Sequence, residues 1–113
     1  MGVYLDLTDL SDPSLTFTAD HVADADVYVD AVLAERGIYR SDLTLPNDLL
    51  TRIAIYWAKR CAAIEGAIGD NSPLIAKARE YESNAKQLVG TISKKALGIT
   101  DSVGFGVVTL GRG

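Results

Sequence analysis

The side chains best suited to chemistry in this 113-residue chain are its one histidine, His21, and its one cysteine, Cys61. A general base needs a positioned partner, and a metal site needs several convergent ligands. His21 has Asp24 three residues on and Ala25 four residues on, a setting typical of a surface histidine. Cys61 falls on an apolar helical stripe, where a thiol behaves as a small hydrophobic residue, and a lone cysteine excludes an intrachain disulfide.

Four acids have the spacing of a calcium-binding loop, in which they would take positions 1, 3, 7 and 12: Asp24, Asp26, Asp30 and Glu35. Position 5 of such a loop is normally Asp or Asn, but here it is Tyr28. Position 6 needs glycine for a sharp turn, and Val29 stands there inside a helical apolar pattern. The four acids are therefore interpreted as the solvated face of a helix.

A pair of glycines near the end of the chain, Gly104 and Gly106, resembles a fragment of a dinucleotide-binding fingerprint. The third glycine of that fingerprint would be position 109, which is threonine, and no helix is predicted to follow. With no Walker sequence and no zinc spacing either, the sequence predicts no catalytic residue, no cofactor-binding residue and no metal ligand. An enzyme is not expected.

The charges are divided unevenly along the chain, although the net charge is only −4. Residues 1–50 contain ten acids and two bases, whereas residues 51–113 contain nine bases and five acids. A sequence pI near 4.8 argues against a general nucleic-acid binder, which usually has a basic face. The division indicates either ordinary solvated faces or complementary surfaces that meet between neighbouring copies.

The length and the 48% hydrophobic content are typical of a single compact domain, residues 1–113. No apolar run approaches the ~20 residues that a membrane-spanning helix needs, so no membrane association is expected. The first residues contain neither the basic region nor the apolar block of a signal peptide. The chain is expected to be soluble and intracellular.

The first half of the chain predicts an extended start and one helix. Val3, Leu5 and Leu7 alternate with polar or aromatic residues, which favours a short strand or an arm within residues 1–17. Thr18 suits the N-cap of a helix that ends before Gly37.

The clearest helical period follows Asn47, an N-cap residue, and runs to about residue 68. Its apolar stripe is the predicted core of the protein: Leu50, Ile53, Ala54, Trp57, Cys61, Ile64 and Ile68. Truncation of Ile53 or Ile64 to alanine is accordingly expected to cost about 2–5 kcal/mol.

A third helix is predicted to begin with Ser72 as its cap and Pro73 at its first position. Its apolar period continues to about Ala96, with Gly90 as a kink and Gly98 as the stop. The predicted fold is therefore mainly α, a three-helix bundle with long second and third helices, a short extended N-terminal arm and a β-like C-terminal tail.

The tail, residues 99–113, alternates in a strand-like way, and its apolar members are Val103, Phe105, Val107, Val108 and Leu110. A terminal strand cannot satisfy its own backbone groups, so it has to pair within the chain, fray in solvent or add to another chain. These five residues are the predicted docking tail, which could add as a strand to another chain.

The layout resembles the head-to-tail adaptor, or connector, proteins of tailed bacteriophages. The likeness covers most of residues 15–100. It depends on the order of the predicted segments and on their residue types rather than on an invariant motif. It lies in an acidic first helix, the connection Leu43-Thr44-Leu45-Pro46, the helix Leu49-Leu50-Thr51-Arg52-Ile53-Ala54-Ile55-Tyr56-Trp57-Ala58, the pair Tyr81-Glu82, and the run Lys94-Lys95-Ala96-Leu97-Gly98-Ile99.

The resemblance implies a structural virion protein in the neck between capsid and tail, present in the host cytoplasm during assembly. Such proteins form a ring beneath the portal, commonly of twelve copies, which extends the DNA channel and docks the tail terminator or stopper protein. Genomic DNA would pass through without specific binding, which suits a net-acidic chain.

A small helical regulatory or DNA-binding module is the alternative. The second and third helices would then be a helix-turn-helix with its turn at Gly69-Asp70-Asn71. Recognition helices are usually shorter and have exposed Arg, Asn or Gln at their start, whereas this helix starts Ser72-Pro73-Leu74-Ile75.

Removal of the tail after Gly98 is predicted to leave the helical content unchanged and to abolish incorporation into portal-containing particles. The tail is expected to be mobile in the free protein and to become ordered when it adds as a strand to the portal or to a neighbouring copy. Circular dichroism measures the helical content, and a particle-incorporation assay measures docking. Normal docking of the truncated protein would show that the tail is not the anchor, and unfolding would show that it is a core strand.

Overall fold

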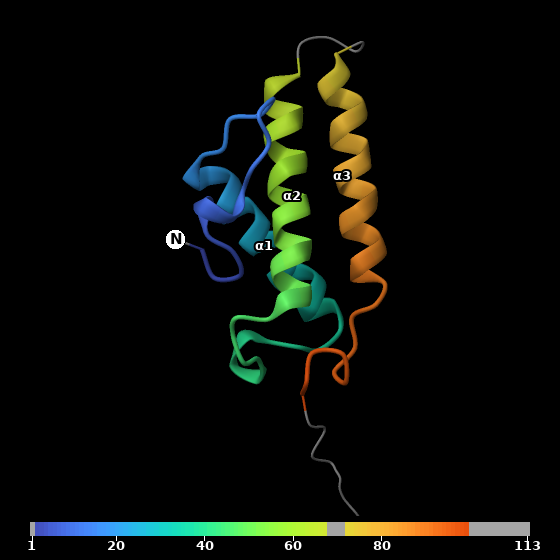
Figure 1. The fold of residues 1–113 in the computed structure, drawn as a ribbon. Coiled ribbons are helices and arrows are strands. Elements are labelled where there is room, and N and C mark those ends of the chain that lie inside the picture. Colours follow the sequence, from blue (N-terminus) through green and yellow to red (C-terminus); the bar gives the residue numbers. More distant parts are fainter. Residues whose placement is uncertain (1, 68–71, 100–113) are drawn as a thin grey trace, which may run out of the picture.

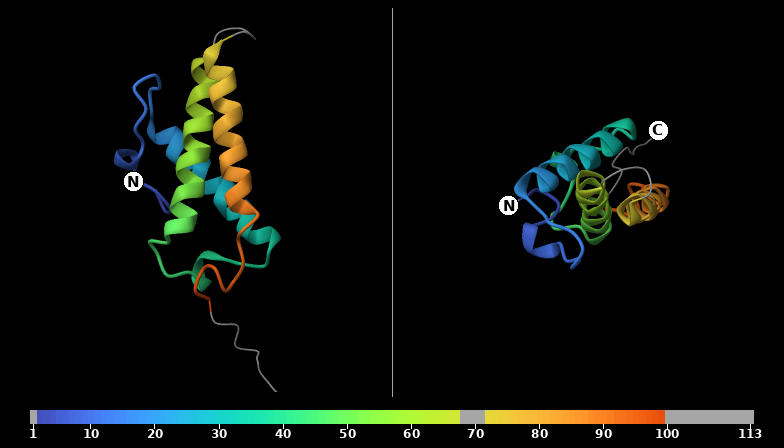
Figure 2. Two further views of the ribbon diagram at one scale, coloured as in Figure 1. Left: turned by 45° about the vertical axis from the view of Figure 1, so that its right-hand side comes forward. Right: turned by 90° about the horizontal axis from the view of Figure 1, so that it is seen from above.

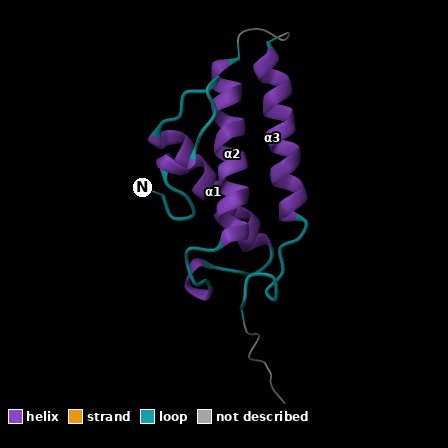
Figure 3. Ribbon diagram, viewed as in Figure 1, coloured by secondary structure: helices purple, strands orange, loops and turns teal. Residues whose placement is uncertain are grey.

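The computed structural model describes residues 2–67 and 72–99, and within them the chain is helical with no strand (Figures 1 and 3). Three α-helices follow one another: α1 Ala19–Glu35, α2 Asp48–Gly66 and α3 Pro73–Val89. Two short 3₁₀ helices, η1 Leu7–Asp9 and η2 Arg40–Asp42, lie in the segments before α1 and α2. The mainly helical three-helix architecture predicted from the sequence is confirmed.

The helix α2 lies in the centre of the fold. Seen from above, α1 runs obliquely across one face of α2, and α3 lies beside α2 (Figure 2). α3 runs antiparallel beside α2 along most of its length, whereas α1 crosses α2 obliquely (Figures 1 and 2). The segment before α1 covers a further side of α2 (Figure 1).

The residues predicted to start each helix do so. The Thr18 N–H donates to Nδ1 of His21 at 3.1 Å at the start of α1. The side chain of Asn47 accepts from the Leu50 N–H at 3.2 Å at the start of α2. Oγ of Ser72 accepts from the Leu74 N–H at 3.2 Å at the start of α3. Each cap satisfies a donor that has no partner within its helix.

The core lies between α1, α2 and the N-terminal segment. The largest fully buried side chains are Val29 and Leu33 of α1, Leu50 and Ile53 of α2, and Ile38 from the connection between them. α3 contributes differently, because its fully buried residues are two alanines, Ala78 and Ala85. Small side chains let two helix axes approach closely, which explains how α3 lies so near α2.

The predicted core stripe on α2 is correct at its start and wrong at its end. Leu50 and Ile53 are fully buried, Trp57 and Cys61 are half-buried, and the Ile64 side chain is 44% exposed. The buried positions after Ala54 are instead alanines, Ala58, Ala62 and Ala63. The helical period predicts burial of the large apolar residues on one face of α2. In the structure α2 is covered from several directions, and alanines occupy the buried positions in its second half.

Of the two alternatives for the N-terminal residues, a short strand or an arm, the structure contains no strand. Residues 2–18 form loops and the 3₁₀ helix η1, with Tyr4 buried and Leu7 43% exposed. The Val3 and Tyr4 N–H groups donate to the carboxylate of Asp26, at 2.9 and 3.1 Å. A side-chain acceptor on α1 thus satisfies these backbone donors.

The third helix ends at Val89, seven residues earlier than predicted, so Gly90 is an end and not a kink. Residues 90–99 turn back beneath α2 (Figure 1). Leu97 is buried there, and Gly98 adopts a positive φ of 76° that closes the last turn. Ile99 packs against the core and so belongs to the body, not to the tail. Residues 100–113, including all five predicted docking residues, lie outside the described residues.

Truncation of Ile53 to alanine is predicted to lower the free energy of unfolding by about 2–5 kcal/mol, because it leaves a cavity in a closed core. The same truncation of Ile64 is predicted to cost less than about 1 kcal/mol, because that side chain is 44% exposed. Urea denaturation of both variants measures the two values. Equal losses would contradict the burial pattern of α2.

Candidate functional site

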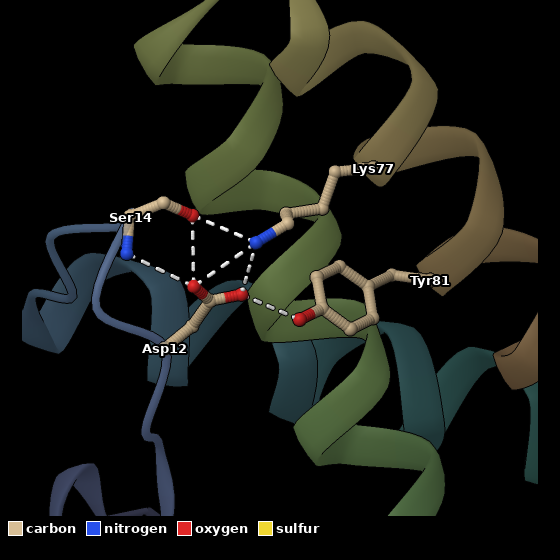
Figure 4. Close-up of polar contacts among 4 residues, drawn as sticks. All are labelled: Asp12, Ser14, Lys77 and Tyr81. Carbon is tan, nitrogen blue, oxygen red and sulfur yellow. Dashed lines mark hydrogen bonds and ion pairs between the residues drawn. The ribbon is translucent and has the colours of Figure 1, made fainter.

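A polar cluster joins the segment before α1 to α3, across one face of α2 (Figure 4). Oδ2 of Asp12 accepts from Nζ of Lys77 at 2.8 Å and from the hydroxyl of Tyr81 at 2.6 Å. Nζ of Lys77 also donates to Oγ of Ser14 at 2.7 Å, and Ser14 donates its hydroxyl to Oδ1 of Asp12 at 2.8 Å. The Asp12 side chain is only 8% exposed. We name these four residues the Asp12 cluster.

Hydrogen bonds from Lys77, Tyr81 and Ser14 hold the pKa of the Asp12 carboxyl well below its usual range. Burial, together with donation to the Asp12 carboxylate, raises the pKa of Tyr81 to about 12. Both shifts reflect one arrangement, in which an ionised carboxylate accepts a hydrogen bond from an un-ionised phenol. Asp12 therefore binds the loop to α3 through charge-assisted hydrogen bonds.

A serine beside a lysine is also the pattern of one class of nucleophilic enzymes. In this cluster, however, the lysine forms an ion pair with Asp12, and an ammonium group has no lone pair with which to take a proton from Ser14. Ser14 in turn directs its hydroxyl proton to the same carboxylate. The geometry suits a structural clamp between the loop and α3 and not an activated nucleophile.

A second polar cluster fixes the N-terminal segment to α1. The Tyr4 hydroxyl donates to the carboxylate of Asp30, which also pairs with the guanidinium of Arg40. The hydrogen bond from Arg40 lowers the pKa of Asp30, and burial together with Asp30 raises the pKa of Tyr4. With Asp26 bonded to two backbone N–H groups, α1 binds this segment through two of its acids.

The four acids with calcium-loop spacing differ in burial. Asp24 and Glu35 are exposed on α1, as predicted. Asp26 and Asp30 do not belong to a solvated face, because one is buried and the other is half-buried, and both hold the N-terminal segment. The sequence showed their helical position but gave no sign of the segment that folds back onto them.

His21 is buried, 2% exposed, and the prediction of a surface residue is wrong. Nδ1 accepts the Thr18 N–H, so the neutral ring carries its proton on Nε2, which lies 3.2 Å from Oε1 of Glu65 on α2. That approach is not aligned as a hydrogen bond. His21 caps α1 and places its ring beside the end of α2, a positional role that i+3 and i+4 neighbours alone do not indicate.

A series of stacked and paired side chains links all three helices. The rings of Tyr28 on α1 and Trp57 on α2 stack with centroids 3.7 Å apart, and the Arg60 guanidinium lies 4.6 Å from the Trp57 ring. Nε of Arg60 also pairs with Glu82 of α3 at 2.9 Å. Burial raises the pKa of the neighbouring Cys61 thiol, which disfavours the reactive thiolate.

In the parts of the chain that the structure describes, no group of three or more His, Cys, Asp or Glu side chains is placed to hold a metal ion. None of the described helices is long and apolar enough to cross a membrane. Comparison of the chain with protein-family models, with curated proteins and with solved structures finds no match.

The mutation Asp12→Asn is predicted to lower the free energy of unfolding by about 1–3 kcal/mol, because it weakens charge-assisted hydrogen bonds to Lys77 and Tyr81. Asp24→Asn removes the same charge from an exposed position and serves as the control.

The pH dependence follows from the same cluster. Because the folded-state pKa of Asp12 lies below its ordinary value of 3.8, its contribution is complete above that value. As the pH falls below the ordinary value, the unfolded chain binds the proton first and the contribution is lost. In denaturation curves, the stability difference between the wild type and Asp12→Asn should therefore stay constant from pH 7 to about pH 4 and then narrow as the pH falls further toward the low folded-state pKa. A difference that does not narrow at low pH would contradict the clamp.

Proposed function

We propose that this protein is a structural virion component of a tailed bacteriophage, a head-to-tail adaptor whose copies form a ring beneath the portal. The ring, commonly of twelve copies in the family that the sequence resembles, would extend the DNA channel and offer a docking face for the tail terminator or stopper protein. The protein would act in the neck of the virion and be present in the host cytoplasm during assembly.

The observation that carries this proposal is the uneven distribution of charge over the fold. Residues 2–47, which include α1, contain nine acids and two bases, a formal charge of −7. Residues 72–99 contain five bases and two acids, a formal charge of +3, of which α3 itself contributes +1, and Lys94 and Lys95 lie in the segment beneath α2. The acidic helix α1 and the weakly basic C-terminal region contact different parts of α2 (Figure 2).

A ring needs two different, mutually complementary sides on each subunit. Unlike charges on two regions of the fold suit this requirement, because the acidic region of one copy can face the basic region of the next. The internal polar clusters support a structural role as well, since their charged groups are used to hold loops and helices together rather than to present reactive atoms.

The arrangement of α2 and α3 differs from a helix-turn-helix. In that motif the helices cross at a wide angle and the second helix is free to enter the major groove. Here α3 lies antiparallel beside α2 (Figure 1). The acidic N-terminal side further favours passage of DNA over its retention.

Assembly is predicted to weaken as salt rises from about 0.05 to about 0.5 M, because exposed charges are screened over a few ångströms at high ionic strength. Native mass spectrometry of the protein alone, and sedimentation of the protein with portal particles of the same phage, measure assembly at each salt concentration. A protein that stays monomeric and fails to bind the portal at either concentration would refute the proposed function. Assembly that is indifferent to salt would instead identify apolar packing as the main contact.

A further inference from the structure

An apolar hollow lies between α2 and α3, near the end of α2. Ile64 of α2 and Ile75 and Ala78 of α3 line it together with Arg79 and Glu82, and its volume is about 240 Å³. The Ile64 side chain is 44% exposed there. Pockets for whole small molecules usually measure ~300–1,000 Å³, so this hollow is better suited to single side chains of a peptide.

A second hollow, of about 430 Å³, adjoins the first along α3. Arg79 and Glu82 line both hollows, and the other residues of the second are Ser83, Lys86 and Gln87. Gln87 lies near the end of α3 and Ile75 near its start. The two hollows therefore form one track along α3, which is polar near the end of the helix and apolar near its start. We call it the α3 track.

The residues that follow Ile99 in the sequence have a matching order of types. Residues 100–102 are Thr-Asp-Ser, and residues 103–110 include the five apolar members of the predicted docking tail. A segment that runs from the end of α3 toward its start places its polar residues, Asp101 among them, beside Lys86. It places its apolar residues beside Ile75 and Ile64.

The tail is long enough to follow the α3 track. Ile99 packs against the core in the segment that turns back beneath α2, where Asn47 donates to the Leu97 carbonyl oxygen at 3.5 Å (Figure 1). Along the helix axis, Asn47 and Ile64 are about 25 Å apart, and the axes of packed helices are separated by a further ~8–10 Å. At ~3.3 Å per residue, the extended segment from Ile99 to Leu110 spans about 36 Å, which is sufficient.

We infer that the tail folds back onto its own chain along the α3 track, with apolar side chains of residues 103–110 in the hollow at Ile64. This inference goes beyond the proposed function and does not depend on it. The sequence alone predicts a tail that is mobile in the free protein, whereas the α3 track offers the tail a place. The contact covers apolar side chains of both the tail and the helices, which favours it in water.

The tail of the same molecule is favoured over that of a second copy. A short flexible connection gives a tethered segment an effective concentration on the order of millimolar, far above that of other copies in a dilute solution. Residues 2–67 and 72–99 contain no strand to which the tail could add, so the contact is made mainly by side chains. Ser83 and Gln87 are exposed beside the path and can hydrogen-bond to an extended backbone.

A photo-crosslinking group in the tail of the full-length chain tests the contact. p-Benzoylphenylalanine replaces Thr109, so that the apolar side chains of the tail stay intact, and mass spectrometry identifies the joined peptides after irradiation. The expected product has the mass of one chain and joins the tail to a peptide that contains Ile64, Ile75 or Ala78. The same group in place of Thr44, an exposed residue before α2, is the control and should not label these residues.

A charge placed in the hollow should remove this product. Ile64→Asp is expected to lower its yield at least about tenfold, because an unpaired carboxylate is unfavourable in an apolar contact. Val27→Asp is the matched control, since Val27 is also exposed, at 67%, but belongs to α1. Both positions are exposed on helices, so the fold should tolerate the changes, and circular dichroism checks this.

Three results would overturn the inference. A product with the mass of two chains identifies the tail of another copy as the occupant. Joined peptides from elsewhere in the chain, or no joined product, show that the tail does not occupy the hollow. Equal yields in the wild type and in Ile64→Asp show that the contact does not depend on the hollow. None of these results bears on the adaptor proposal, because neither a portal nor a ring enters the measurement.

Discussion

One helix, α2, is contacted on three sides, and the rest of the fold depends on its being covered from all of them. α1 meets it through the stacked rings of Tyr28 and Trp57, and α3 meets it through the Arg60–Glu82 pair. On a third side the hydroxyl of Thr51 donates to the carbonyl oxygen of Tyr4 at 2.7 Å. Neither α1 nor α3 has an extensive contact with the other, so each is held in place mainly through α2.

This constraint explains how the acids of the first half are used. The segment before α1 packs Tyr4, Leu5 and Leu10 into the core, and carboxylates fix it to the helices as well. Asp12 reaches α3, while Asp26 and Asp30 receive the N-terminal segment on α1. Such partly buried, charge-assisted bonds contribute more than exposed ion pairs, because solvent screens them less. The acids that remain exposed define the charge of the α1 side.

The sequence predicts best what is decided locally. Helix starts depend on a cap residue and its next few neighbours, which is why Thr18, Asn47 and Ser72 were identified without a structure. Burial depends on which segments meet. The helical period includes Ile64 in the core, yet Ile64 is exposed and lines a hollow of about 240 Å³ between α2 and α3 with Ile75 and Ala78. The role of Asp26 is missed for the same reason, because its partners Val3 and Tyr4 are more than twenty residues away in sequence. The burial of His21 is missed because it follows from the cap with Thr18 and from the position of the ring beside Glu65 of α2.

Each of the helices α1 and α3 can cover only one face of α2. Accordingly, α1 directs Val29 and Leu33 inward, and α3 directs Ala78 and Ala85 inward. Their exposed residues are mostly small or charged, which avoids a large hydrophobic patch in contact with solvent. Within the described residues, the packing of both helices and of the N-terminal segment therefore depends on α2.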